Sequence, residues 1–236
     1  MDSSAVIPFE NSASAKTLKM ENSIDMYYFP ASPPTRAVLM LARALGLMMN
    51  LKLVNIMEGE QMKPEFLKLN PMHTVPTMDD GGYVLWESKA IMKYLSDKYD
   101  KTGKFKAVNA EHEGKINEIL YFDGTTLFPR LGDYMRPVMG GLEQPNNEKL
   151  SRIEEALKVL NVLLAGNKYA GGSQMSIADF ALTSTVSTIE AVKVDLSPYA
   201  NVMAWYKIMK KEMPGFDDID KKGADMIAAV FAAKAA

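Results

Sequence analysis

The hydrophobic residues of this chain follow two different patterns, and the change between them falls near residue 100. Before that point, short runs that favour strands alternate with stretches whose apolar residues have the i, i+3, i+4 spacing of a helix. In chain order, these patterns predict a strand at 24–29, a helix at 34–45, a strand at 51–56, a helix at 64–69, strands at 76–78 and 83–86, and a helix at 88–99. The predicted order of this half is therefore β-α-β-α-β-β-α.

Beyond the polar stretch at 100–104, every clear pattern has helical spacing, so we predict an all-α second half. One helix start is well marked, because Ser176 and Asp179 have the spacing of a capping box. Met175 and Phe180 are placed to form the accompanying hydrophobic staple. We expect Ser176 to be structural, since a nucleophilic serine needs a base and no histidine lies near it in the sequence.

The predicted organisation has four parts: a mobile tail at 1–23, an α/β domain at 24–100, a linker at 101–106 and an all-helical domain at 107–236. The tail is rich in Ser, Ala and Asn and lacks the charged start and apolar core of a signal peptide. Apolar runs elsewhere are far shorter than the roughly 20 residues that a membrane span needs. We therefore expect a cytoplasmic protein with no membrane contact.

Composition narrows the possible chemistry. The 236 residues include no cysteine, which excludes disulfides, thiolate metal sites and catalytic cysteines. The only histidines are His73 and His112, which disfavours a multi-histidine metal site, and we expect no metal; carboxylates alone could still hold a hard cation. The formal net charge is −2 and no segment is strongly basic, so we expect no nucleic-acid partner. Any thiol chemistry must use a thiol supplied by a second molecule.

The element order, with Pro76 at the start of the third strand, is typical of a thioredoxin-like domain. Three segments carry a closer resemblance to a known family: Tyr27–Ser32, Leu69–Thr77 and Leu85–Ile91. The chain resembles the cytosolic glutathione transferases, most of all the insect delta class, with the epsilon class as its neighbour. The resemblance covers about residues 25–230 and implies a thioredoxin-like domain followed by an all-α domain.

Ser32 lies between a predicted strand and the start of a helix, where the resemblance places the catalytic hydroxyl. A hydroxyl there can donate a hydrogen bond to the glutathione sulfur, and the positive end of the helix dipole favours the thiolate. We expect Ser32 to act as this donor and not as a nucleophile. The alternative is a serine that only caps the helix or closes a proline-rich turn.

The resemblance assigns further contacts with glutathione to residues of three segments: Gln61; His73, Thr74, Val75 and Pro76; and Glu87, Ser88 and Lys89. It implies a cis Val75–Pro76 bond and backbone pairing of Val75 with the cysteinyl part of glutathione; a trans proline that opens a strand is the alternative. It places Glu87 and Ser88 at the glutamyl end, although helix capping alone also selects such residues. His73 is expected to donate to the glycyl carboxylate, although a lone loop histidine is more often a surface residue.

Two of these residues depart from the pattern of the delta class. Lys89 stands where that class usually has Arg, and Gln61 where it often has a second His. Lysine lacks the bidentate fork of arginine, so we expect weaker glutathione binding or thiol ionisation. Asp123 matches an acid that supports the glutamyl end of glutathione in the family; a solvated carboxylate beside Gly124 is the alternative.

The second substrate is expected between the domains, on a long helix at 116–136 and on the C-terminal helix, because apolar electrophiles need an apolar wall. The candidates are Phe128, Leu131, Tyr134, Met135, Met226 and Val230. Each of them is equally compatible with a place in the core.

Together, these features and the resemblance imply a homodimeric glutathione transferase that detoxifies small apolar electrophiles. Glutathione would be its co-substrate, and no cofactor would be bound permanently. Conjugation, dehydrohalogenation and peroxide reduction begin with the same thiolate, so the sequence does not separate them. The alternative function keeps the fold without catalysis, as a carrier or interaction protein that binds apolar ligands. The combination of Ser32, His73, Glu87 and Ser88 favours the enzyme.

Overall fold

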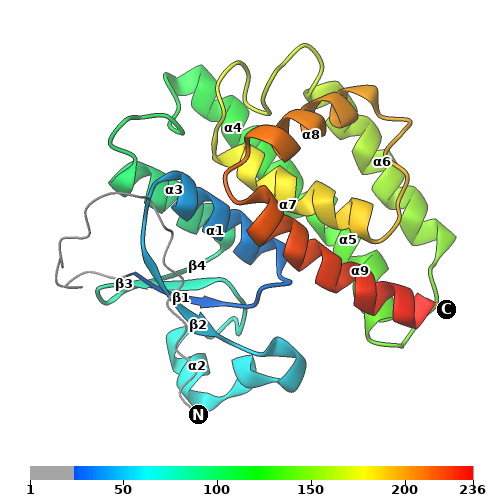
Figure 1. Ribbon diagram of the computed structural model, residues 1–236, viewed down its shortest axis with the longest axis horizontal. Coiled ribbons are helices and arrows are strands. Elements are labelled where there is room, and N and C mark those ends of the chain that lie inside the picture. The colour runs from blue at the N-terminus through cyan, green and yellow to red at the C-terminus, as the bar shows by residue number, and fades with distance from the viewer. Residues whose placement is uncertain (1–23, 236) are drawn as a thin grey trace.

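The computed structural model describes residues 24–235, so the predicted tail at 1–23 lies outside the described residues. A four-stranded sheet organises the first half of this region (Figure 1). Its strands are β1 (Ile24–Tyr28), β2 (Met49–Leu53), β3 (Thr77–Asp80) and β4 (Tyr83–Trp86). The strand order is β2-β1-β3-β4; β2 runs parallel to β1, and the pairings of β3 with β1 and β4 are antiparallel.

Three helices accompany the sheet: α1 (Pro33–Ala44), α2 (Pro64–Leu69) and α3 (Ser88–Tyr99). Between β2 and α2 lie two short 3₁₀ turns, η1 (Ile56–Glu58) and η2 (Glu60–Met62). In Figure 1, α1 and α3 lie between the sheet and the helical half, and α2 lies on the other side of the sheet. This arrangement confirms the predicted thioredoxin-like order β-α-β-α-β-β-α.

The named elements of the second half, as far as residue 235, are all helices, as predicted, with one isolated β-bridge between Tyr169 and Gly172. Its elements are α4 (Ala110–Phe122), η3 (Asp123–Leu127), α5 (Phe128–Met139), α6 (Asn147–Leu163), α7 (Ile177–Ala191), α8 (Ala200–Glu212), η4 (Phe216–Lys221) and α9 (Lys222–Ala235). Residues 100–109 connect the two halves, and the Phe105 ring of this connection packs edge-on against Phe180 of α7, with 5.3 Å between ring centroids. Within residues 24–235, no helix is long and apolar enough to cross a membrane.

The long helix expected at 116–136 is not uniform, because the π-helical turn η3 separates α4 from α5. Two residues explain the change of winding. Gly124 has a low helix propensity, and Pro129 has no N–H to donate to the carbonyl one turn earlier. The long helix predicted over 116–136 is continuous, and the π-helical turn inside it was not predicted. The turn matters for the site because it carries Asp123.

Ser176 has the structural role predicted for it. It forms a capping box with Asp179 at the start of α7. The Asp179 carboxylate also accepts hydrogen bonds from the Ala170 N–H at 2.8 Å and from the Trp205 indole at 2.9 Å. Burial raises the pKa of Asp179, while these hydrogen bonds oppose the shift. The carboxylate thus joins the start of α7 to α8 inside the core.

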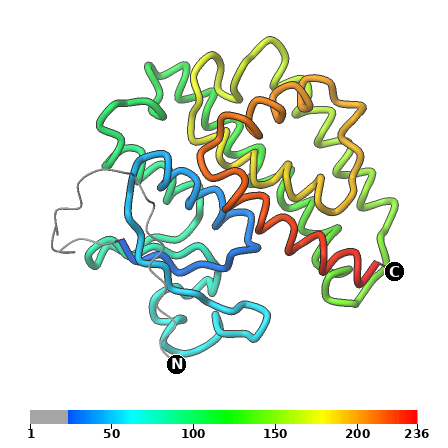
Figure 2. The backbone as a smooth tube through the Cα atoms, viewed as in Figure 1, coloured from blue at the N-terminus to red at the C-terminus, as the bar shows by residue number. Residues whose placement is uncertain are grey.

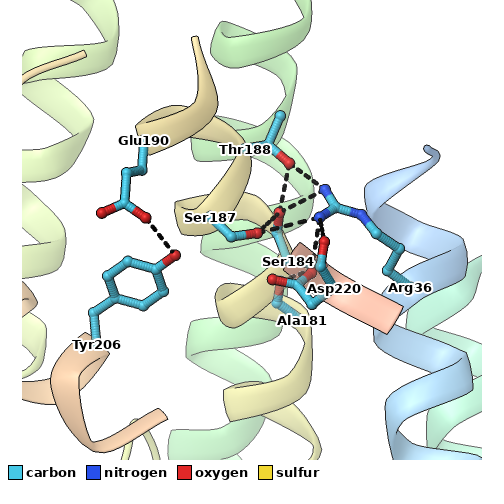
Figure 3. Close-up of polar contacts among 8 residues, drawn as sticks. All are labelled: Arg36, Ala181, Ser184, Ser187, Thr188, Glu190, Tyr206 and Asp220. Carbon is cyan, nitrogen blue, oxygen red and sulfur yellow. Dashed lines mark hydrogen bonds and ion pairs between the residues drawn. The ribbon is translucent and has the colours of Figure 1, made fainter. Parts of the chain in front are cut away.

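The α/β half and the helical half meet where α1 packs against α7 (Figure 2). At this contact, Arg36 of α1 and Asp220 of η4 form an ion pair at 2.9 Å with both side chains fully buried (Figure 3). The Arg36 guanidinium also donates to the Asp220 carbonyl at 2.6 Å and to the Thr188 hydroxyl. Because α1 begins next to Ser32, these bonds fix the helix that carries the predicted catalytic residue.

Candidate functional site

The sheet register brings the ends of three segments to one edge of the sheet. Thr77 pairs with Tyr27 on one side and with Trp86 on the other. Since β3 runs antiparallel to both neighbours, the segment before β3 lies beside the segments that follow β1 and β4. These segments contain Val75, Ser32 and Ser88, respectively. The topology therefore gathers the three predicted groups of site residues at the edge where α1 and α3 begin.

Ser32 is the N-cap residue of α1 and is half-buried. Its side chain makes no capping hydrogen bond. The local sequence accounts for part of this, because Pro33 and Pro34 occupy the first two helical positions and have no N–H to offer the hydroxyl, which leaves only the Thr35 N–H as a capping donor. The hydroxyl is therefore available to a ligand at the positive end of the helix dipole.

Asn70 holds the loop that precedes β3. Its fully buried amide donates to the Thr74 carbonyl at 3.1 Å and to the Thr77 hydroxyl at 2.9 Å, and its carbonyl oxygen accepts from the Met72 N–H at 2.9 Å. Our sequence analysis did not single out this residue. The available signal was the Asn-Pro pair, because asparagine before proline favours a turn that its own side chain closes.

Three of the four predicted glutathione-binding residues of this loop have accessible surface. His73 and Thr74 are exposed, Val75 is half-buried and Pro76 is buried. The Val75–Pro76 peptide bond is cis, as the resemblance implied. His73 has a φ of +47°, so its backbone lies in the left-handed region that few residues other than glycine adopt. The loop therefore presents side chains and backbone of this segment to the edge of the sheet.

Glu87 and Ser88 stand at the start of α3. Glu87 is exposed and has a φ of +67°, a sparsely populated conformation for a residue with a Cβ. It makes no side-chain capping bond, and Ser88 begins the helix with its own side chain largely buried. Such backbone strain occurs preferentially at functional sites. The first N–H groups of α3 have no partner within the helix and can bind an anion.

Lys89 connects this helix start to the helical half. Its ammonium lies 2.7 Å from Asp123 Oδ2, and the Asp123 side chain is only 2% exposed. The alternative of a solvated carboxylate is therefore wrong. Within the described residues, Oδ1 of Asp123 and Oε1 of Gln61 are buried without a hydrogen-bond partner. Both are acceptor oxygens with almost no exposed surface.

The six predicted electrophile contacts fall into two groups. Leu131, Tyr134 and Met135 of α5 are buried, and the Tyr134 ring packs against Phe231 of α9 with 5.7 Å between ring centroids. Accessible surface comes from the other three: Phe128 and Val230 are half-buried, and Met226 is 44% exposed. In residues 24–235, no three His, Asp or Glu side chains gather as a metal site.

Two family models match the chain. The model described as "Glutathione S-transferase, N-terminal domain" matches residues 26–103, and the one described as "Glutathione S-transferase, C-terminal domain" matches residues 127–211. Together they span both halves of the fold and the edge where the candidate residues meet. The fold and the site thus define an enzyme of the glutathione-transferase class. The chain belongs to the glutathione S-transferase family, and glutathione is the co-substrate of this family.

Solved structures agree with this assignment. The chain is 41% identical to a delta-class glutathione transferase of Nilaparvata lugens, with a TM-score of 0.86 over 89% of this chain and 99% of that chain. It is 31% identical to an epsilon-class enzyme of the housefly Musca domestica, with a TM-score of 0.85 over 90% of this chain and 98% of that chain. A homologue from Drosophila mojavensis, solved with bound glutathione, is 32% identical, with a TM-score of 0.83 over 90% of this chain and 98% of that chain.

Proposed function

We propose that this enzyme ionises the thiol of glutathione through a hydrogen bond from Ser32 and transfers the thiolate to small apolar electrophiles. One observation carries the proposal: the Ser32 hydroxyl stands at the start of α1 and is not used as a helix cap. A free cysteine thiol has a pKa of about 8.5, so only a few per cent is thiolate at neutral pH. Each unit by which the pKa falls corresponds to about 1.4 kcal/mol of preferential stabilisation of the thiolate.

The remaining contacts orient glutathione toward Ser32. The Val75 backbone pairs with its cysteinyl part, and His73, with Thr74 and Gln61 nearby, holds the glycyl end. Glu87, Ser88 and Lys89 hold the glutamyl end, with Asp123 fixing the Lys89 ammonium. Pro76 keeps the loop in the conformation that exposes the Val75 backbone.

The electrophile then binds on the surface that Phe128, Met226 and Val230 leave accessible between α5 and α9, with Leu131, Tyr134 and Met135 supporting it from the core. We place the enzyme in the cytoplasm as a homodimer that detoxifies such compounds, and we take residues 24–100 and 107–236 as its two domains. Dehydrohalogenation and peroxide reduction use the same thiolate and are further reactions of this site.

The test is the pH dependence of the initial rate of glutathione conjugation to 1-chloro-2,4-dinitrobenzene. We compare the wild type with Ser32→Ala and with the control Ser151→Ala, which alters an exposed serine of α6. We expect Ser32→Ala to lower kcat about 100-fold, the effect of removing one donor to a developing anion, and Ser151→Ala to change it less than two-fold. Full activity of Ser32→Ala would contradict the proposal. If the wild type binds glutathione but does not turn over, the chain is a carrier.

A further inference from the structure

One arginine shares the outer face of α5 with Phe128, and our sequence analysis did not single it out. Phe128, Gly132 and Arg136 follow one another at intervals of four residues, so they lie on the same face of the helix. Phe128 is half-buried and Arg136 is exposed, so this face borders the solvent. Arg136 therefore belongs to the surface on which we place the electrophile.

The Arg136 side chain folds back along α5 toward the start of the helix, the usual direction for a long helical side chain. Its guanidinium carbon lies over the Phe128 ring, 5.6 Å from the ring centroid, in a cation–π contact. A Cβ on Gly132 would lie only 3.0 Å from the same carbon, so the glycine leaves the room that the guanidinium occupies. The positive charge is thus held beside Phe128.

The Arg136 charge is not compensated by an acidic side chain. Among residues 24–235, no Asp or Glu carboxylate forms an ion pair with it. A guanidinium presents its donors in a planar fork that matches the two oxygens of a carboxylate. The face therefore combines an aromatic ring with a cation that is available to a ligand.

The helices α5 and α9 both begin near the predicted glutathione site. Asp123, which precedes α5 in the chain, contacts Lys89 at 2.7 Å. A Cβ on Gly223 of α9 would lie 2.4 Å from the Pro30 carbonyl oxygen, so α9 begins beside the loop that leads to Ser32. The reacting thiolate is therefore expected near the first turns of both helices.

From there, α5 and α9 run side by side in the same direction. Tyr134 packs against Phe231 with 5.7 Å between ring centroids, and a Cβ on Gly141 would lie 3.9 Å from the Lys234 ammonium, so the contacts follow chain order in both helices. Arg136 comes about two turns after the start of α5. An electrophile that meets the thiolate near the start of α5 thus directs its far end toward Arg136.

We propose that Arg136 makes this enzyme select electrophiles that carry a carboxylate at the end away from the reacting carbon. The inference rests on the proposed transferase function and names the substrate class of the same site. Arg136 binds the carboxylate by charge-assisted hydrogen bonds, while the Phe128 ring packs against the apolar body of the substrate.

The bond changes take place at the other end of the substrate. With an aryl chloride, the thiolate sulfur forms a bond to the carbon that bears chlorine, and the carbon–chlorine bond breaks with release of chloride. The thiol proton has already passed to the solvent when the thiolate forms. Arg136 takes no part in these steps, so it is a specificity-determining residue.

The experiment compares two substrates with the same reacting carbon, 4-chloro-3,5-dinitrobenzoate and the uncharged 4-chloro-3,5-dinitrobenzamide. The group opposite the chlorine is a carboxylate in the first and a carboxamide in the second. We measure kcat/KM for both in the wild type, in Arg136→Gln and in the control Arg152→Gln, which removes an exposed arginine of α6. Circular dichroism verifies that each variant is folded. The ratio of the two kcat/KM values cancels any general loss of activity.

We expect the benzoate-to-benzamide ratio to fall about five-fold or more in Arg136→Gln, because a charge-assisted hydrogen bond is lost, and to change less than about two-fold in Arg152→Gln. In the wild type, the KM for the benzoate should rise as NaCl increases from about 0.02 M to about 0.3 M, and that for the benzamide should not. This second readout needs no variant, so it decides the question if Arg136→Gln does not fold.

Two results would overturn the inference and leave the transferase function intact. One is an unchanged ratio in folded Arg136→Gln, or an equal fall in both arginine variants. The other is the same salt dependence of the two KM values. If the wild type binds glutathione and turns over neither substrate, the proposed function fails and this inference fails with it.

Discussion

The choice of lysine or arginine at position 89 changes how many hydrogen bonds this side chain can make to Asp123 and to a ligand. The Lys89 ammonium is a compact point charge and already contacts Asp123 at 2.7 Å. An arginine presents five donors in a planar fork, so it can bind Asp123 and a ligand carboxylate together. We therefore propose that lysine at this position holds the glutamyl end of glutathione less strongly than arginine would.

We predict that Lys89→Arg lowers the KM for glutathione several-fold at unchanged kcat, because the guanidinium adds a second aligned hydrogen bond. The control is Lys93→Arg, one turn further along α3, where the lysine contacts Asp97 at 2.7 Å on the surface. Steady-state kinetics with glutathione as the varied substrate measures both variants. An unchanged or increased KM in Lys89→Arg would contradict this prediction.

At the scale of residues, local motifs could be predicted from the sequence and long-range partners could not. The capping box at Ser176 and the helix start at Ser32 depend on neighbours within four positions, so their signals lie in the sequence itself. Arg36 and Asp220 are 184 positions apart, and only the fold brings them together. Asn70 combines both kinds of contact. Its turn is local and has a sequence signal, but its hydrogen bond to Thr77 depends on the sheet.

At the scale of elements, one carboxylate fastens the β3–β4 hairpin to α3. Asp80, the last residue of β3, accepts hydrogen bonds from the Lys98 ammonium at 2.6 Å, the Tyr99 hydroxyl at 2.6 Å and the Tyr94 hydroxyl at 2.8 Å. Burial raises the pKa of Asp80, but these hydrogen bonds outweigh it and hold the pKa below its ordinary value. The ionised carboxylate therefore stabilises the folded state.

The sign of this shift gives a pH-dependent prediction. Because the folded pKa of Asp80 lies below the unfolded value, its stabilisation is complete above the unfolded pKa of 3.8 and is lost as pH falls through the folded pKa. Asp80→Asn should cost about 1–2 kcal/mol at pH 7, and the difference from the wild type should shrink in acid. Urea unfolding at a series of pH values measures this. If Asp80→Asn lowers the free energy of unfolding equally at acid and neutral pH, the Asp80 charge does not stabilise the fold. Asp97→Asn, on the surface of α3, is the control variant.

The order of helices and strands could be predicted from the spacing of hydrophobic residues. The early end of β2 and the π-helical turn η3 could not. Helices 64–69 and 88–99 have the predicted bounds, because proline, serine and apolar periodicity mark their ends. The second strand ends at Leu53, earlier than predicted, because Asn55 caps the η1 turn by accepting from the Met57 N–H. The π-helical turn η3 was missed since apolar spacing alone does not distinguish it from a regular helix.

At the scale of the whole molecule, Arg36 joins α1 to α7 and η4. Breaking a buried ion pair by removing one partner costs about 3–5 kcal/mol, because the other charge stays buried and uncompensated. We predict a loss of this size for Arg36→Met and partial recovery in the double variant Arg36→Met/Asp220→Leu. The control Arg130→Met removes the partly exposed pair with Glu155 and should cost less than about 1 kcal/mol. Chemical unfolding measures the stability of all three variants. A loss of less than about 1 kcal/mol in the free energy of unfolding of Arg36→Met would contradict this role of the Arg36–Asp220 ion pair.

The sequence also predicted the overall plan of the molecule, a thioredoxin-like half followed by a helical half, because the period of the apolar residues changes between them. The hollow between α1, the edge strand β2 and the η4–α9 segment could not be predicted, because Leu51 and Ile219, which both line it, are far apart in the chain. Only the path of α9 past the edge strand leaves a hollow between them.

The central claim is that Ser32 stabilises the thiolate of bound glutathione. The most direct measurement is the pH titration of the ultraviolet absorbance of the thiolate in the complex with glutathione, for the wild type and for Ser32→Ala. We predict a bound thiol pKa at least one unit below that of free glutathione in the wild type, and a return toward the free value in Ser32→Ala. The same bound pKa in both proteins would contradict it.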